Sequence, residues 1–321
     1  MSESSRRECS DCGSQDRREF LAATGALLGV AALSEGVWGA PSRSSAAETA
    51  VGRLYESLTA AQRKVVLVPW NDERRTRISA NWHVTKAGVQ SFTKEQQALI
   101  TQIVEGVTSA DGYERFLKQM EDDDGGIAQY SVAIFGDPNG TQFEFALTGR
   151  HLTLRADGDT TPGAAFGGPI VYGHGAEGDP KQNLFWYQTK QVNEVFAMLD
   201  GKQREKALVA RAPTENAVQL RQAGAALPGI SGRELSSDQK AVLRRSLEAV
   251  FAPYRKEDVA EAFEVFEAGG GIDALNVAFY RSGDLDNDQV WDVWRLESPT
   301  VVCHFRGAPH VHAYINVAKR S

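Results

Sequence analysis

Cysteine is scarce in this chain, with three in 321 residues. Cys9 and Cys12 lie together near the N-terminus, and Cys303 stands alone near the C-terminus. A protein that keeps only Cys303 after loss of an N-terminal segment has no intramolecular disulfide, which excludes the disulfide-stabilised scaffold of small secreted domains. An ordinary hydrophobic core must hold the fold together, and a chain of this length can bury one.

Excess positive charge and a long hydrophobic run are also missing. The chain has 35 Lys and Arg against 42 Asp and Glu, for a net charge of −7, and no block of basic residues. Nucleic-acid binding rests on a basic surface that neutralises phosphates, so this balance argues against it. The apolar stretch at residues 20–33 is shorter than the roughly 20 residues of a membrane-spanning helix. We expect no stable membrane span in the mature form.

That apolar stretch follows an arginine pair near the N-terminus. The segment Asp16 to Leu21 contains Arg-Arg-Glu-Phe-Leu and resembles a twin-arginine export signal. We expect residues 1–47 to be this signal and a linker, cleaved after Ala47 because Ser45 and Ala47 are small; a retained N-terminal anchor is the alternative. The twin-arginine translocase is then the partner during export, and the mature protein is periplasmic or extracellular.

The chain contains a degenerate internal repeat. Residues 58–64 resemble 199–205, and residues 92–100 resemble 235–243. Repeats of this kind indicate duplicated structural units. Each half carries two matching glutamines at nearly equal spacing, namely Gln62 with Gln96 and Gln203 with Gln239.

Hydrophobic periodicity and turn residues predict the elements of each half. Thr93 and Ser236 precede apolar residues at helical spacing, in the pattern of N-terminal caps. Segments rich in β-formers and separated by Gly, Asn and Pro turns predict strands. The predicted helices cover 49–67, 94–106, 111–121, 190–211, 237–250 and 256–267, and the predicted strands cover 130–136, 141–148, 151–156, 274–281, 290–296, 301–305 and 310–317.

Helices followed by an antiparallel meander occur twice, so the sequence predicts an α+β fold of two degenerate pseudo-twofold halves. The N-terminal half covers residues 48–156, and the C-terminal half, residues 190–321, carries a histidine cluster. A Gly/Pro-rich connector at 157–189 joins the halves. We expect its residues 157–179 to form a long ordered loop that lines a site, because long loops within compact domains are usually functional or disordered.

Half of the six histidines, together with Cys303, lie within ten residues near the C-terminus. These are His304, His310 and His312, with Arg306 between them. Imidazole and thiolate bind borderline and soft metals, and residues two apart on a strand point to one face. The segment predicts a transition-metal site for Cu, Zn or Fe, in which Arg306 either orients an anion or is an ordinary turn residue. The alternative is that His310 and His312 are polar residues on a solvent-facing strand.

The register of the terminal hairpin decides which group joins His310 and His312. A turn centred on residues 307–308 pairs Cys303 with His312 and places Cys303 on their face. A shift of the pairing by one residue brings His304 opposite His310 instead. The sequence therefore leaves a Cys-His-His set and a three-His set open.

The repeat adds a histidine from the first half. Aligning Leu147 with Leu296 places His151 at the start of a strand equivalent to the one that contains His304, so His151 is expected near the terminal hairpin. A strand-end histidine bonded to the backbone is the alternative. His174 stands between two glycines, which permit either close approach to a ligand or a tight turn, and it is a further candidate for the pocket.

These features resemble a family catalogued as a domain of unknown function, number three thousand five hundred. The resemblance rests on residues 149–152, on the connector through Pro169 and on the terminal His310-Val311-His312, and it spans essentially all of the mature chain. Relatives often have two adjacent histidines in the motif at residues 149–152, where this chain has Arg150 before His151. They also often have an acidic residue just before the proline that is Pro169 here, where this chain has Gly168. The resemblance supports the three histidines as a group and implies no activity.

Two functions follow as hypotheses. The first is an exported metalloprotein that is an enzyme acting on a small molecule, with His151, His310 and His312 as ligands and His304 or Cys303 as a fourth. Three protein ligands leave a coordination position for water, oxygen or substrate, as metal-assisted hydrolysis or oxidation requires. The second is a non-enzymatic binding or carrier protein.

Overall fold

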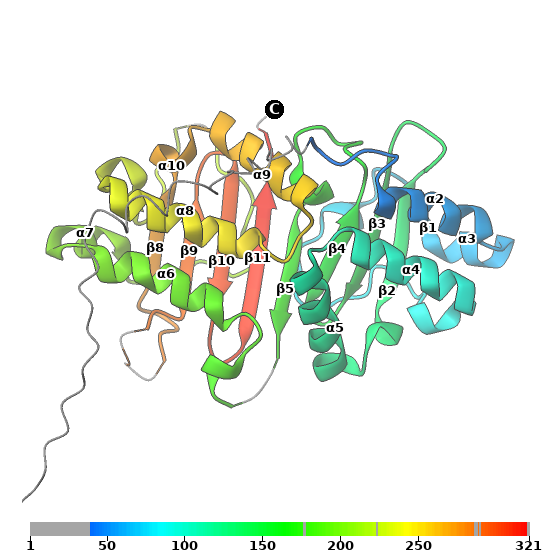
Figure 1. Ribbon diagram of the computed structural model, residues 1–321, viewed down its shortest axis with the longest axis horizontal. Helices are drawn as coiled ribbons and strands as arrows, with labels where there is room; N and C mark the ends of the chain where they lie inside the picture. The colour runs from blue at the N-terminus through cyan, green and yellow to red at the C-terminus, as the bar shows by residue number, and fades with distance from the viewer. Residues whose placement is uncertain (1–38, 176–177, 223, 286–287, 289, 320–321) are drawn as a thin grey trace, which may run out of the picture. The chain divides into compact units, whose positions relative to one another are not determined.

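One mixed β-sheet runs through the residues that the computed structural model describes, which are 39–175, 178–222, 224–285, 288 and 290–319 (Figure 1). In spatial order its strands are β1 (Leu67–Val68), β2 (Ser131–Gly136), β3 (Phe143–Gly149), β4 (Leu152–Ala156), β5 (Ile170–His174), β11 (Val311–Val317), β10 (Val301–Arg306), β9 (Val293–Glu297), β8 (Asn276–Tyr280) and β6 (Leu208–Val209). The short β7 (Ile230–Ser231) also pairs with β8. The β1–β2 and β6–β8 pairs are parallel, and the other pairs are antiparallel.

Helices pack on one face of this sheet, which confirms the predicted α+β class (Figure 1). They are α2 (Ala46–Ser57), α3 (Ala60–Val66), α4 (Lys94–Gly106), α5 (Ala110–Asp124), α6 (Trp186–Met198), α7 (Gly201–Ala207), α8 (Ser237–Phe251), α9 (Lys256–Ala268) and the short α10 (Gly271–Ala274). The helices predicted at 94–106, 111–121, 237–250 and 256–267 are confirmed as α4, α5, α8 and α9. The seven predicted strands are confirmed as β2, β3, β4, β8, β9, β10 and β11.

The single helices predicted at 49–67 and 190–211 are each two helices. Thr59 and Asp200 have extended backbones and cap the helices that follow, because each side chain accepts a hydrogen bond from the backbone N–H three residues on. Such a cap starts a new helix at a point where apolar periodicity alone predicts continuation.

The matched glutamines of the repeat bond to each other in both halves. Gln62 Nε2 donates to Gln96 Oε1 at 2.8 Å, and Gln203 Nε2 donates to Gln239 Oε1 at 3.1 Å. Each of these four side chains also completes the capping box at the start of its own helix. The recurring sequence pattern therefore marks a recurring helix-to-helix contact.

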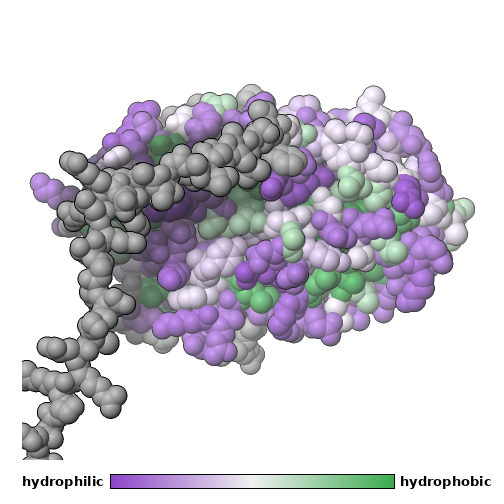
Figure 2. Space-filling view, viewed as in Figure 1, coloured by the Kyte–Doolittle hydropathy of each residue, from purple (hydrophilic) through white to green (hydrophobic). Residues whose placement is uncertain are grey.

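The main core lies between the helices and the sheet. It draws on both halves, from Leu54 and Ile100 to Phe251 and Trp294, each of which is fully buried. Figure 2 shows the outer surface of this helical layer covered largely by hydrophilic side chains. Smaller clusters cover the opposite face of the sheet, where the segments at 78–84 and 212–220 pack against it. The sheet is therefore buried on both faces, and the described residues group into one compact unit.

The connector predicted at 157–189 is not a loop throughout. Residues Ile170–His174 form β5, which lies in the middle of the sheet between β4 and β11. The antiparallel pairing of β5 with β11 joins the two halves. The segment predicted to lie over a site is thus a central strand, and its end, at His174, borders the histidine cluster.

The N-terminal part of the predicted export signal, residues 1–38, lies outside the described residues. The rest of that predicted segment packs on the folded unit, since α2 begins at Ala46 and Ala47 is fully buried. The predicted cleavage point after Ala47 lies within the first turn of this helix. In the part of the chain that the structure describes, no helix has the length and apolar character to cross a membrane.

Candidate metal centre

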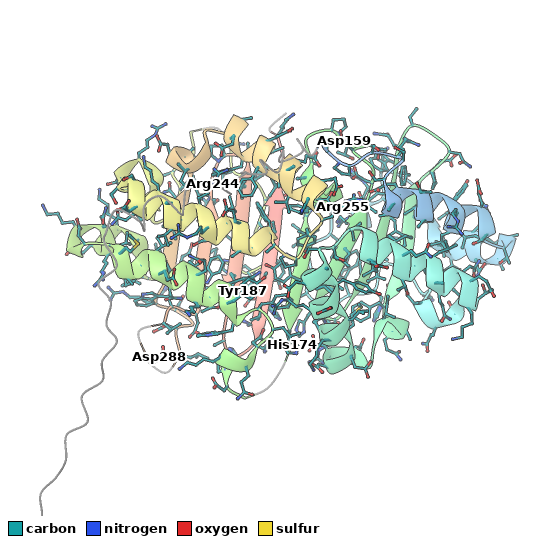
Figure 3. All side chains as sticks on the ribbon, in the orientation of Figure 1. Asp159, His174, Tyr187, Arg244, Arg255 and Asp288 are labelled. Atoms are coloured by element: carbon teal, nitrogen blue, oxygen red, sulfur yellow. The ribbon has the colours of Figure 1, made fainter. Side chains whose placement is uncertain are left out.

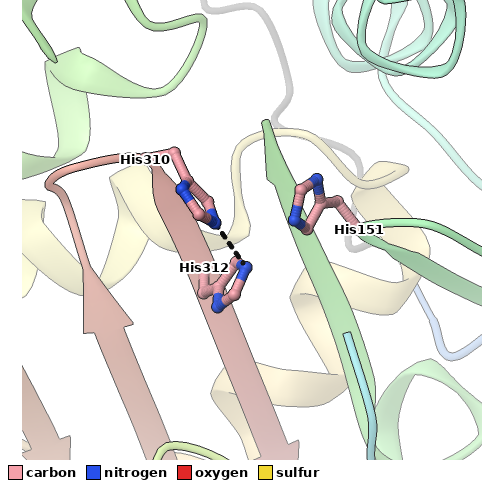
Figure 4. Close-up of side chains that lie close together, drawn as sticks. All are labelled: His151, His310 and His312. Carbon is pink, nitrogen blue, oxygen red and sulfur yellow. Dashed lines mark hydrogen bonds between the residues drawn. The ribbon is translucent and has the colours of Figure 1, made fainter. Parts of the chain in front are cut away.

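Three histidines from both halves of the chain meet at one end of the sheet (Figure 4). One ligand atom from each of His151, His310 and His312 lies within 4.8 Å of the others, and the Nε2 atoms of His310 and His312 are 3.1 Å apart. Tetrahedral coordination with metal–nitrogen bonds of about 2.0–2.1 Å places ligand nitrogens about 3.3 Å apart. These three side chains therefore lie close enough together to hold a metal ion.

His151 occupies the tight turn between β3 and β4. Its φ of 57° lies in the left-handed region, which costs a residue with a side chain on the order of 1 kcal/mol. Its backbone N–H donates to the carbonyl of Ala80 at 2.6 Å, so the neighbouring segment fixes the turn. Strain at a non-glycine position is a frequent property of functional residues, and here it aims the imidazole at the terminal hairpin.

Strand alternation directs His312 to the face of the sheet opposite the helices. Val311 and Ala313 point into the main core, so His312 between them points the other way. His310 lies in the turn just before β11. The centre thus combines one residue of a central strand with residues of two turns.

Both predicted hairpin registers are wrong. Arg306 pairs with His312, and the turn between them is longer than either prediction allows. In this register His304 pairs with Tyr314 and shares the face of His312, whereas Cys303 pairs with Ile315 and points into the main core.

Neither Cys303 nor His304 belongs to the group of three histidines. Burial raises the pKa of the Cys303 thiol well above its usual range, so this sulfur stays protonated. His304 lies beside Arg295, whose Nε is 3.4 Å from its Nδ1, and burial together with that positive charge lowers the pKa of His304 to about 3. The predicted fourth ligand is therefore supplied by neither residue in this conformation.

Two of the three histidines each contact a carboxylate through Nδ1. Asp123 Oδ2, at the end of α5, is 2.8 Å from His151 Nδ1, and Glu215 Oε2 is 2.8 Å from His312 Nδ1. A carboxylate on Nδ1 fixes the tautomer that leaves Nε2 without a proton and free to bind a metal. Asp123 and Glu215 thus orient the rings of His151 and His312.

Burial and nearby charges set the protonation states of the histidines and of their carboxylate partners. Burial lowers the pKa of His310 to about 4, and the nearby positive charges of His312 and Arg306 act in the same direction. Burial also lowers the pKa of His312, although Glu215 opposes that shift. Burial alone would raise the pKa of Asp123 and of Glu215, but their hydrogen bonds with histidine lower both. Near neutral pH His310 and His312 are therefore neutral, and Asp123 and Glu215 are ionised.

Arg306 lies against the same ring nitrogens. Its Nη2 is 3.0 Å from His310 Nε2 and 2.9 Å from His312 Nδ1, and its Nη1 is 2.9 Å from Glu215 Oε1. Arg306 therefore contacts two of the three histidines and Glu215. A metal on His310 Nε2 would compete with this guanidinium for the same lone pair.

His174 lies beside the centre and faces a different partner. Its Nε2 is 3.0 Å from Asp122 Oδ2, and Figure 3 places it at the end of β5. Gly175, on one side of it, packs closely against the centre: a Cβ there would lie 2.9 Å from His151 Cε1 and 2.7 Å from Asp123 Oδ1. On the other side, a Cβ on Gly173 would collide with the backbone oxygen of Val311.

A family model described as a protein of unknown function, DUF3500, matches residues 41–317. The chain belongs to the DUF3500 family. The expected resemblance is therefore confirmed. No curated protein and no solved structure matches the chain. Because the family's description states no activity, the chemistry of this member has to be argued from its own residues.

Sequence reasoning missed Asp123 and Glu215 in this DUF3500 protein. One signal for Asp123 was present, because the acidic run 122–124 ends α5, where the helix dipole disfavours negative charge. Acids at that position need a partner, and Asp122 and Asp123 find His174 and His151. Glu215 lies in an irregular segment and had no signal of its own.

Proposed function

We propose that this protein binds a transition metal through Nε2 of His151, His310 and His312. The observation that carries the proposal is the convergence of the three imidazoles within 4.8 Å, with a carboxylate behind two of them. Imidazole ligands suit copper, zinc and iron, and thiolate is excluded because Cys303 points into the core. The metal would be held by three neutral nitrogens.

A three-histidine centre leaves a coordination position for an exogenous ligand. His310 and Arg306 are partly exposed, so that position opens toward solvent. A metal held in this way acts as a Lewis acid and lowers the pKa of a bound water. We infer a metal-dependent enzyme that hydrolyses or oxidises a small molecule.

We further propose that the two halves are related by a pseudo-twofold axis between β5 and β11. The matched glutamine pairs support this relation. So does a reciprocal contact in which Ser109 N–H donates to Pro253 O and Arg255 N–H donates to Val107 O, just ahead of the equivalent helices α5 and α9. The metal ligands then come from both halves, with His151 from the first and the other two from the second.

We also propose that the protein is exported. The arginine pair and the apolar stretch at residues 20–33 support recognition by the twin-arginine translocase and a periplasmic or extracellular location. That route carries folded proteins, so the metal would be acquired before the protein crosses the membrane.

The test is elemental analysis of protein purified from a host that exports it. We expect one transition metal per chain in the wild type, and strong loss of metal in His310→Ala and His312→Ala with the circular dichroism spectrum unchanged. His83→Ala is the matched control, since His83 is exposed and lies outside the group. Wild-type protein without stoichiometric metal, or full retention in both variants, would contradict the proposal.

The alternative is a non-enzymatic binding or carrier protein. The contact of Arg306 with the imidazoles favours it, because a guanidinium among neutral rings also suits anion binding without chemistry. Turnover of a small-molecule substrate by the metal-loaded protein supports the enzyme, whereas stoichiometric binding without turnover supports the carrier.

A further inference from the structure

Arg306 is held in place at the rim of the histidine centre. Its Nη1 bonds to Glu215 Oε1 at 2.9 Å, and its Nε donates to the backbone carbonyl of His310 at 3.3 Å. Its backbone pairs with that of His312 on the adjacent strand, so the two side chains share one face of the sheet. A side chain anchored in this manner presents Nη2 in a defined direction.

That direction is toward the place of a metal. Nη2 lies 3.0 Å from His310 Nε2 and 3.3 Å from His312 Nε2. When a metal takes these lone pairs, Nη2 loses its acceptors while Nη1 stays on Glu215. A guanidinium donor without an acceptor then stands next to the open coordination position.

The charges of the loaded centre add up to a positive surplus. The carboxylates of Asp123 and Glu215 each lie 2.8 Å from Nδ1 of a ligating histidine, and their two negative charges together balance a divalent metal. The imidazoles are neutral ligands, and Asp122 is already paired with Lys118 and His174. The charge of Arg306 remains, and an anion at the open position would neutralise it.

We propose that the centre takes a small ligand with an anionic oxygen, as in a carboxylate or a phosphate, bound jointly by the metal and by Nη2 of Arg306. This inference rests on the proposed metal site and names the class of its substrate. Guanidinium groups bind carboxylate and phosphate oxygens through short, charge-assisted hydrogen bonds. Glu215 positions Arg306 and His312 together, so the anion site and the metal site share one support.

The test uses full-length protein loaded with Co²⁺, whose visible absorption responds to new ligands. Wild type is titrated with acetate and, separately, with inorganic phosphate, and the anion that binds more tightly identifies the class. In Arg306→Gln the anion affinity should fall about 10- to 100-fold while cobalt stoichiometry is unchanged. Arg306→Lys keeps the positive charge but lacks the planar guanidinium, so its anion affinity should lie between those of wild type and Arg306→Gln. Arg150→Gln is the matched control, because Arg150 is exposed and adjoins His151.

The outcomes separate this inference from the metal proposal. Equal anion affinity in wild type and in Arg306→Gln overturns the inference, and so does equal affinity of wild type with and without cobalt. A protein that binds cobalt and neither anion overturns the inference alone. A wild type that binds no cobalt overturns the metal proposal as well. Thermal unfolding of each variant verifies that the fold is intact.

Discussion

Single contacts behind the histidines decide which nitrogen each one offers. Asp123 takes Nδ1 of His151 and Glu215 takes Nδ1 of His312, so both rings present Nε2 to the centre. Gln119 Nε2 and the Gly175 N–H in turn donate to Asp123. The fold itself therefore sets the orientation of these two rings.

Asp123→Asn should weaken metal binding about 10- to 100-fold, because the amide no longer stabilises the required tautomer of His151 by charge. Competition with a chromophoric chelator measures the affinity. Asp111→Asn is the control, as Asp111 lies on the same helix and is exposed. Equal affinity in both variants would show that Asp123 does not act on the ligand.

Gly175→Ala should disturb the centre from the backbone side. The new Cβ would approach His151 Cε1 to 2.9 Å and Asp123 Oδ1 to 2.7 Å, so one of them must move. We expect a loss of about 1–3 kcal/mol in the free energy of unfolding and weaker metal binding. Urea unfolding and chelator competition measure the two effects. Gly201→Ala is the control, because no atom lies within 4 Å of a Cβ there; similar effects of both changes would rule out the steric argument.

The histidines of the centre could be predicted from the sequence, and their partners could not. His310 and His312 are two apart on a predicted strand, and the repeat pointed to His151. Asp123 and Glu215 reach the centre only through tertiary packing of a helix end and an irregular segment, which no local pattern encodes. The exclusion of Cys303 depended on a hairpin register that the length of the turn sets.

At the scale of elements, local signals identified the helices and the meander strands but not β5. This strand is short and glycine-containing, and its partners β4 and β11 lie far apart in the sequence. Pairing of that kind leaves no periodic pattern. The short β1 and β6 were also missed. Each is only a two-residue extension of a helix.

A cluster of carboxylates lies between α9 and the segment after β4, at the end of the sheet remote from His174; Figure 3 labels Asp159 there. Burial raises the pKa of Glu261 to about 8, and the negative charges of Asp159 and Asp157 add to the shift. The unfolded chain ionises Glu261 near its ordinary value of 4.5. The folded state therefore binds the extra proton, and stability falls as pH rises from about 4.5 to about 8.

Glu261→Gln should remove this loss, because the amide has no proton to release. We expect the variant to gain on the order of 1–2 kcal/mol over wild type at pH 8 and little at pH 4. Urea unfolding across this pH range measures the difference. Glu267→Gln, at an exposed position on the same helix, is the control and should keep the wild-type pH dependence. A parallel pH dependence of Glu261→Gln and wild type would contradict the assignment.

At the scale of the whole molecule, the centre ties the two halves together. His151 directly precedes β4, and His310 and His312 flank the start of β11, with β5 between these strands. Unfolding of either half destroys the ligand set. Metal binding at the proposed centre would therefore be linked to the stability of the complete chain.

Saturating metal should raise the unfolding free energy in a single transition, by about 2.7 kcal/mol when the free metal is 100 times its dissociation constant. Removal with a chelator should reverse the change. Differential scanning calorimetry measures it, and His312→Ala should show no response to metal. A response confined to one of two separate transitions would contradict the shared centre.

X-ray absorption spectroscopy of the metal-loaded protein would observe the proposed ligands themselves. We expect three imidazole nitrogens at about 2.0–2.1 Å and one further light atom, with one imidazole lost in His151→Asn. Asparagine tolerates the left-handed backbone at this position, so the turn survives the change. A sulfur neighbour at about 2.3 Å, or a spectrum that His151→Asn leaves unchanged, would contradict it.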